Sequence, residues 1–143
     1  MSPLSLPFPA DLLYLVEHDV WARLEDDGTA TVGITALGIK LSGEIYMCRV
    51  KPVGATIDQG RSVAVVELAK AIVSVKSAVS GEVLEANPLL DDEPELVHRD
   101  PYGAGWLARL APRDLAADRR LLAHGAEVIE AMTRHAAAME RSP

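Results

Sequence analysis

The chain has 143 residues, a formal net charge of −7 and hydrophobic residues at 49% of its positions, which describes one globular domain with modest extensions and argues against disorder. Because an acidic surface repels phosphate backbones, we expect no nucleic-acid partner. No apolar run reaches the ~20 residues that span a bilayer, so we expect no membrane partner. A single cysteine, Cys48, excludes an internal disulfide, and the start of the chain lacks a basic leader, so we expect a cytoplasmic protein.

The first half of the chain predicts short strands. Residues 1–12 form a proline-punctuated tail. A strand at Val20–Leu24 and a second at Thr29–Ile34 flank an Asp-Asp-Gly turn and so make a hairpin. A further strand is expected at Glu44–Val50, and its alternation divides the side chains between two faces, with Ile45 and Met47 on one and Tyr46, Cys48 and Val50 on the other.

The middle of the chain continues the pattern of short strands. Two runs rich in β-branched residues, Ser62–Glu67 and Ile72–Lys76, are joined by a turn at Leu68–Ala71. Another strand is expected around Val79–Val83, before the Asn-Pro pair at residues 87–88 ends it. Many short strands with regular turns predict a mainly β fold, either a small barrel or a sandwich.

The last residues predict helices instead. Asp114 can cap a helix that runs to His124, and Gly125 breaks it. A second helix, Glu127–Glu140, carries an apolar stripe at helical spacing, formed by Ile129, Met132, Ala136 and Met139. We therefore divide the chain into a tail (1–12), a β domain (13–112) and a C-terminal helical extension (113–143), whose helices are expected to pack on the β domain.

Lys70 occupies the turn between two β-branched runs. A hairpin here holds its amine at an exposed tip, above strands that fix the backbone. Such a geometry suits post-translational acylation, because the modifying enzyme needs an accessible amine and the attached arm needs a rigid base. The alternative is an ordinary solvated lysine that guards the hairpin against edge pairing.

Three segments around Lys70 resemble the core signature of lipoyl-bearing carrier domains, namely Gly54–Gly60, Val66–Ala71 and Val79–Val83. Downstream, Pro94–Leu107 contains the uncommon motif Asp-Pro-Tyr-Gly-x-Gly-Trp and closely resembles the glycine cleavage system H protein family, as does Thr31–Thr35. The resemblance extends over about residues 18–123.

The resemblance implies a barrel-sandwich hybrid fold, of the kind found in lipoyl and biotinyl carriers, with lipoate joined by an amide bond to Lys70. Lys76 is the nearby rival, but it lies inside the returning strand. Biotin carriers place their lysine between two methionines, whereas alanines flank Lys70 here. Glu67, three residues earlier, is a candidate for recognition by the lipoylating enzyme, a lipoate ligase or lipoyl transferase; an ordinary polar strand end is the alternative.

The same resemblance implies a carrier protein, not an enzyme. The chain departs from the family's usual pattern at Ala36–Lys40, Leu68-Ala69 and Ala78. Its stretch Val32–Gly54 resembles the H-protein-like lipoate-binding proteins of the sulfur-oxidising heterodisulfide reductase-like system, a branch that fits these departures better. They favour an arm that shuttles bound sulfur between a sulfurtransferase and a heterodisulfide reductase-like complex. One alternative is a glycine cleavage H protein, serving glycine decarboxylase, aminomethyltransferase and dihydrolipoyl dehydrogenase. A second is an unlipoylated binding or scaffold protein.

Other chemistry has little support in the sequence. The four histidines and Cys48 lack the spacing of metal ligands, and the acidic run around residues 91–95 lacks that of a calcium loop. We therefore expect no metal site and no catalytic residue, and we expect Cys48 to be a small buried hydrophobic residue.

Overall fold

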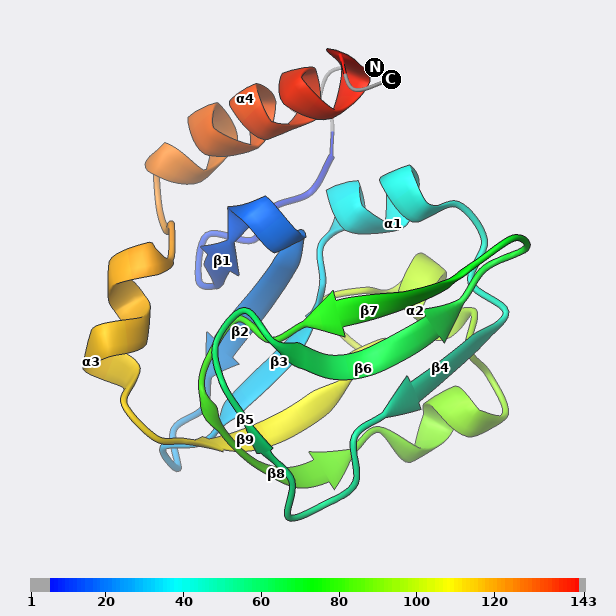
Figure 1. Ribbon diagram of the computed structural model, residues 1–143. Coiled ribbons are helices and arrows are strands. Elements are labelled where there is room, and N and C mark those ends of the chain that lie inside the picture. Colours follow the sequence, from blue (N-terminus) through cyan, green and yellow to red (C-terminus); the bar gives the residue numbers. More distant parts are fainter. Residues whose placement is uncertain (1–5, 142–143) are drawn as a thin grey trace.

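A computed structural model describes residues 6–141, so the first residues of the predicted tail and the last two of the predicted extension lie outside the described part. The strands form two antiparallel sheets, one with the order β1-β2-β3-β9-β8-β5 and the other with the order β4-β6-β7 (Figure 1). The predicted mainly β fold is confirmed. Within residues 6–141, no helix has both the length and the apolar character needed to cross a bilayer.

The predicted strands are present, with ends shifted by a few residues. The six-stranded sheet contains β1 (Leu13–Leu15), β2 (Val20–Leu24), β3 (Ala30–Ile34), β9 (Ala108–Pro112), β8 (Gly81–Ala86) and β5 (Thr56–Ile57). The other sheet contains β4 (Met47–Val50), β6 (Ser62–Glu67) and β7 (Ile72–Lys76). The helices are α1 (Ala36–Ser42), α2 (Leu96–Arg99), α3 (Leu115–Asp118) and α4 (Glu127–Arg141), with 3₁₀ turns at Val16–His18, Pro88–Asp91 and Arg119–Leu121.

Both faces of the β1–β3 region are buried. One face contributes Leu13, Leu15 and Val32 to the main core, which fills the space between the two sheets. The opposite face contributes Tyr14 and Trp21 to a second apolar cluster beneath α4. This double burial explains why every residue of β3 is buried, and why the alternation of Val20–Leu24 is weak in the sequence.

Helix α4 seals the second cluster, but with a stripe that differs from the predicted one. Val128, Met132 and Ala136 are buried against the cluster, whereas Ile129 and Met139 are exposed. Two members of the predicted stripe are therefore wrong. The buried face runs through Val128. A spacing of four residues, 128-132-136, follows one side of the helix as closely as the predicted spacing does, so both stripes fit the helical period.

Helix α1 is absent from the sequence prediction. Its first turn is capped by Thr35, whose Oγ1 accepts a hydrogen bond from the Gly38 N–H at 3.1 Å. Gly43, with φ of +74°, ends the helix in a backbone conformation that favours glycine. The helix is only two turns long, so its apolar residues do not produce a readable helical stripe.

The predicted faces of the Glu44–Val50 strand are also partly wrong. Strand β4 begins at Met47, so Ile45 lies before the pleated segment and does not share the face of Met47. Ile45 and Cys48 are buried, whereas Tyr46 and Met47 are exposed. Strict alternation holds only inside a regular strand, which is why it fails across this boundary.

The predicted Asp114 cap is confirmed, since its Oδ1 accepts the Ala117 N–H at 3.1 Å. The helix ends earlier than predicted, because Ala123 exchanges two backbone hydrogen bonds of 2.8 and 2.9 Å with Tyr14 of β1. Asp118 lies between the Asp114 cap and Ala123, and its buried carboxylate accepts hydrogen bonds from the Ser80 N–H and Oγ at 2.7 and 3.1 Å. This contact joins the C-terminal extension to the segment between β7 and β8.

Candidate functional site

Lys70 lies at the tip of the β6–β7 hairpin, in the Lys70 turn (Leu68–Ala71). The last strand pair before the turn is Glu67 with Ile72, and the Leu68 N–H donates to the Ala71 carbonyl at 2.8 Å. The Lys70 side chain is exposed, and the tip extends beyond the rest of the molecule (Figure 1). The position predicted for this lysine is therefore confirmed.

The base of the Lys70 turn is fixed by packing. β6 is the central strand of its sheet, paired with β4 on one side and β7 on the other. Its residues Val63, Ala64 and Val66 are buried in the main core. A free side chain thus stands on an immobilised backbone, which is the arrangement that a mobile arm requires.

Lys76, the rival for modification, lies within β7 as predicted. It is half-buried, and its Nζ donates to the Ser74 Oγ at 3.1 Å. A strand position of this kind offers an enzyme less access to the amine than the Lys70 turn does.

Glu67 is exposed at the end of β6, and its backbone carbonyl accepts the Tyr46 N–H at 2.8 Å. Cross-strand register places it between Met47 of β4 and Ile72 of β7. The carboxylate therefore lies beside the Lys70 turn, where a partner that reaches Lys70 can meet it.

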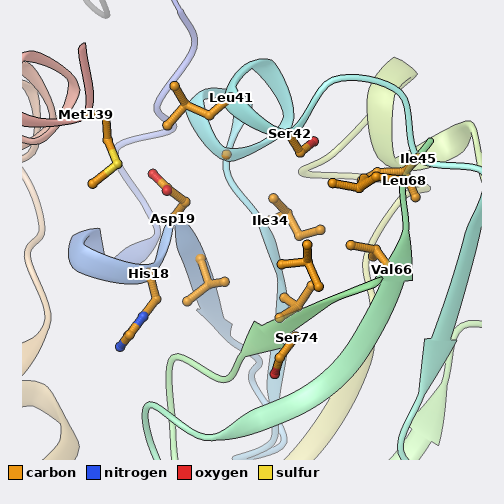
Figure 2. A pocket seen from close by; sticks show the side chains of 14 residues that line it. His18, Asp19, Ile34, Leu41, Ser42, Ile45, Val66, Leu68, Ser74 and Met139 are labelled. Atoms are coloured by element: carbon orange, nitrogen blue, oxygen red, sulfur yellow. The ribbon is translucent and has the colours of Figure 1, made fainter. Parts of the chain in front are cut away.

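A cavity of about 360 Å³ lies between α1 and β7, beside the hairpin, and we call it the α1–β7 cavity. Figure 2 shows Val66, Leu68 and Ser74 on its hairpin side, and Asp19, Leu41 and Met139 toward the helices. Leu68 belongs to the Lys70 turn, so the cavity begins where the turn begins. Its lining is mainly apolar, and its volume lies within the ~300–1,000 Å³ of small-molecule sites.

Asp19 contributes a carboxylate to the cavity wall, and its Oδ1 lies 3.0 Å from Nε2 of His135 of α4, which stands outside the lining. Burial raises the pKa of the Asp19 carboxyl above its ordinary value, and the neighbouring His135 opposes that shift. Asp19 has a φ of +59°, a left-handed conformation that aspartate tolerates better than most residues. The pair holds the end of α4 close to the cavity.

The sequence did not predict the α1–β7 cavity. Its walls come from the 3₁₀ turn Val16–His18, α1, the hairpin and the last turn of α4, which are far apart along the chain. In the sequence, His18 and His135 lack the spacing of metal ligands, and no local motif joins them to Lys70. The pairing of an exposed amine with an adjacent apolar cavity fits an acyl chain that ends in an apolar ring.

Cys48 is not available as a second thiol for this site. Burial raises the pKa of its thiol to about 11, with a smaller contribution from Asp91. Its prediction as a small buried residue is confirmed. Among residues 6–141, no three His, Cys, Asp or Glu side chains gather as metal ligands would.

Comparison with known proteins identifies the family. The family model for glycine cleavage H-protein matches residues 12–135, nearly the whole chain. The chain belongs to the glycine cleavage H-protein family. Glycine cleavage system H proteins 2 and 3 of Aquifex aeolicus are 39% and 38% identical to it, each over 89% of this chain and over 79% and 81% of their own lengths.

A solved structure supports the same assignment. The glycine cleavage system H protein of Mycobacterium marinum superposes with a TM-score of 0.67 and 32% identity, covering 73% of this chain and 86% of that one. The likeness confirms the predicted fold class, although the two sheets remain separate in this chain. Proteins of the family carry lipoate covalently on a lysine, and they act as carriers rather than catalysts.

Proposed function

We propose that this chain carries its lipoate on Lys70 and serves as the H protein of a glycine cleavage system. The observation that carries the proposal is the position of Lys70, an exposed amine at the end of a fixed hairpin. The names of its relatives support glycine as the pathway, with glycine decarboxylase, aminomethyltransferase and dihydrolipoyl dehydrogenase as partners. We keep the cytoplasm as the expected compartment, because these partners act on small soluble metabolites.

The bond-making step of attachment uses only the Lys70 amine from this chain. After losing a proton to the lipoylating enzyme, Nζ attacks the carbonyl carbon of an activated lipoate such as its adenylate. The C–N bond forms, the bond between the carbonyl carbon and the phosphate oxygen breaks, and adenosine monophosphate leaves with the electron pair. A second proton then leaves the nitrogen, so a cationic amine becomes a neutral amide and the turn loses a charge.

Once attached, the lipoyl group supplies two sulfurs that can take up a transferred group and a pair of electrons. The chain itself contributes a rigid hairpin to which the arm is attached and an apolar cavity beside it. Leu68 connects the Lys70 turn to the α1–β7 cavity, whose lining is mainly apolar. Tethering raises the effective concentration of the arm at each successive active site.

A sulfur carrier remains the second candidate. The two Aquifex relatives are numbered 2 and 3, so that organism holds more than one protein of this name. In this chain the departures at Ala36–Lys40 and Leu68-Ala69 fall on α1 and the Lys70 turn, beside the cavity. A cargo other than an aminomethyl group would meet these residues first.

Glu67 is the residue we propose for recognition by the lipoylating enzyme. Its exposed carboxylate stands beside the Lys70 turn, and within residues 6–141 it takes part in no ion pair that would compete with a basic residue of the enzyme. Glu67→Gln keeps the shape and removes the charge, so it should slow lipoylation without lowering the unfolding midpoint.

Intact-mass measurement with peptide mapping tests the attachment site. Chain isolated from a lipoate-replete host should carry one lipoyl group on Lys70, and Lys70→Arg should carry none, while Lys76→Arg should remain fully modified. Modification of the Lys70→Arg protein, or an unmodified wild-type protein, would contradict the proposal.

Loading assays separate the two pathways. Lipoylated chain mixed with glycine and purified glycine decarboxylase should gain the mass of an aminomethyl group. If it gains none, but gains sulfur from a persulfide-bearing sulfurtransferase, the second candidate is correct.

A further inference from the structure

The outer face of the β4–β6–β7 sheet bears an exposed apolar patch beside the Lys70 turn. Met47, Glu67 and Ile72 lie on one cross-strand rung, and Arg49 and Val65 lie on the next rung away from the tip. These five residues surround a shallow hollow of about 80 Å³, and we call them the Ile72 patch.

The apolar members of the Ile72 patch are unusually exposed. Ile72 is 71% and Met47 is 45% exposed, although both are large and lie in strands that could have turned them inward. The opposite face holds Cys48, next to Met47, and Val66, next to Glu67, both buried in the main core, and also Val73, next to Ile72, which is 42% exposed. Met47 and Ile72 flank Glu67 on this rung, so two exposed apolar side chains and one carboxylate are offered together to a partner that approaches the Lys70 turn.

The patch adjoins the proposed substrate amine. Ile72 is two residues after Lys70 and Glu67 is three before it, so the rung lies within ~10 Å of the tip along the strands. An enzyme that acylates Nζ must enclose the end of this side chain in its active site. The rim of that active site then rests on the residues at the base of the turn.

Two other occupants fit less well. A stable contact between two copies of the chain needs roughly 20–30 residues a side, far more than this patch offers. Enzymes that act on the dithiolane work at the far end of the arm, so they need not cover the base of the turn. The lipoylating enzyme is the partner that must approach the amine itself.

We propose that the Ile72 patch is the docking surface for the enzyme that acylates Lys70, with Met47 and Ile72 supplying the apolar contact. This inference rests on the proposed attachment at Lys70. The partner is expected to present a small apolar surface opposite Met47 and Ile72. It should also present a basic group toward Glu67 and an acceptor toward Arg49, whose guanidinium lies 3.7 Å from the Met47 sulfur.

Lipoylation kinetics test the proposal. Full-length unmodified chain is incubated with an ATP-dependent lipoate ligase, lipoate and ATP, and initial rates are measured by intact mass at several chain concentrations. Ile72→Thr combined with Met47→Thr should raise KM for the chain roughly tenfold or more with little change in kcat, since two apolar contacts are lost. Ile72→Val, which keeps most of the apolar surface, should remain close to wild type.

Leu84→Thr is the matched control, because Leu84 lies in a strand of the other sheet and is 40% exposed. It should leave KM unchanged, and an equal rise in this variant would overturn the inference. An unchanged KM in the double variant would also overturn it, while loss of lipoylation in Lys70→Arg would leave the proposed function standing. A wild-type dimer that the double variant converts to a monomer in sedimentation would assign the patch to self-association instead. Thermal unfolding of each variant confirms that it is folded.

Discussion

Replacing Asp118 with alanine is expected to destabilise the protein strongly. The Asp118 carboxylate accepts two buried hydrogen bonds from Ser80, of 2.7 Å from the N–H and 3.1 Å from Oγ. Hydrogen bonds to a charged group contribute about 1.5–3 kcal/mol each, so the loss of two should be on the order of 3–6 kcal/mol. For a domain of this size, the unfolding midpoint should fall by roughly 10–20 °C.

Asp118→Asn is the comparison that isolates the carboxylate. Its side-chain oxygen can still accept the Ser80 N–H, and its amide can donate to the hydroxyl, so the loss should be about 1 kcal/mol. Urea unfolding followed by the fluorescence of the buried Trp21 measures both variants. If Asp118→Ala costs no more than Asp118→Asn, Asp118 does not join the C-terminal extension to the β domain in the way the geometry indicates.

Three further outcomes follow from buried groups. Because burial raises the Cys48 pKa to about 11, its thiolate should be scarce at pH 8, and alkylation by iodoacetamide should be more than ~100-fold slower in the folded chain than in urea. Asp19→Asn should stabilise the fold at neutral pH. The pKa of the Asp19 carboxyl is raised in the folded state, so its ionisation above that pKa lowers the free energy of unfolding. The difference in stability between wild type and Asp19→Asn should therefore shrink as the pH falls through the raised pKa. A difference that grows in acid would contradict this reasoning. Gly33→Ala should cost about 1–3 kcal/mol in urea unfolding, because the new Cβ would lie 2.5 Å from the Trp21 ring; an unchanged midpoint would show that the ring can move aside.

Local patterns predicted the hairpin and the position of its lysine. β-branched runs on either side of a short turn specify two paired strands, and the register then places Lys70 at the tip. The cap at Asp114 was likewise predictable, because capping depends on neighbours within one turn.

Features that depend on long-range packing were not predictable. Whether Val128 or Ile129 faces the core is decided by Tyr14 and Trp21 on a strand that lies far away in the sequence. The α1–β7 cavity and the buried Asp118 arise in the same way, from segments that only tertiary structure brings together. Helix α1 was not predicted for a different reason, because two turns are too short to show a helical period in the sequence.

The Lys70 turn is a single narrow protrusion. An enzyme that encloses it to acylate Lys70 keeps the arm away from every other active site, so this enzyme must dissociate before the carrier can work. Rapid dissociation after the reaction favours a low-affinity encounter over a lasting complex. A mutation that tightened this encounter would be expected to slow the whole sequence of reactions, because the carrier would stay bound to the enzyme that modifies it.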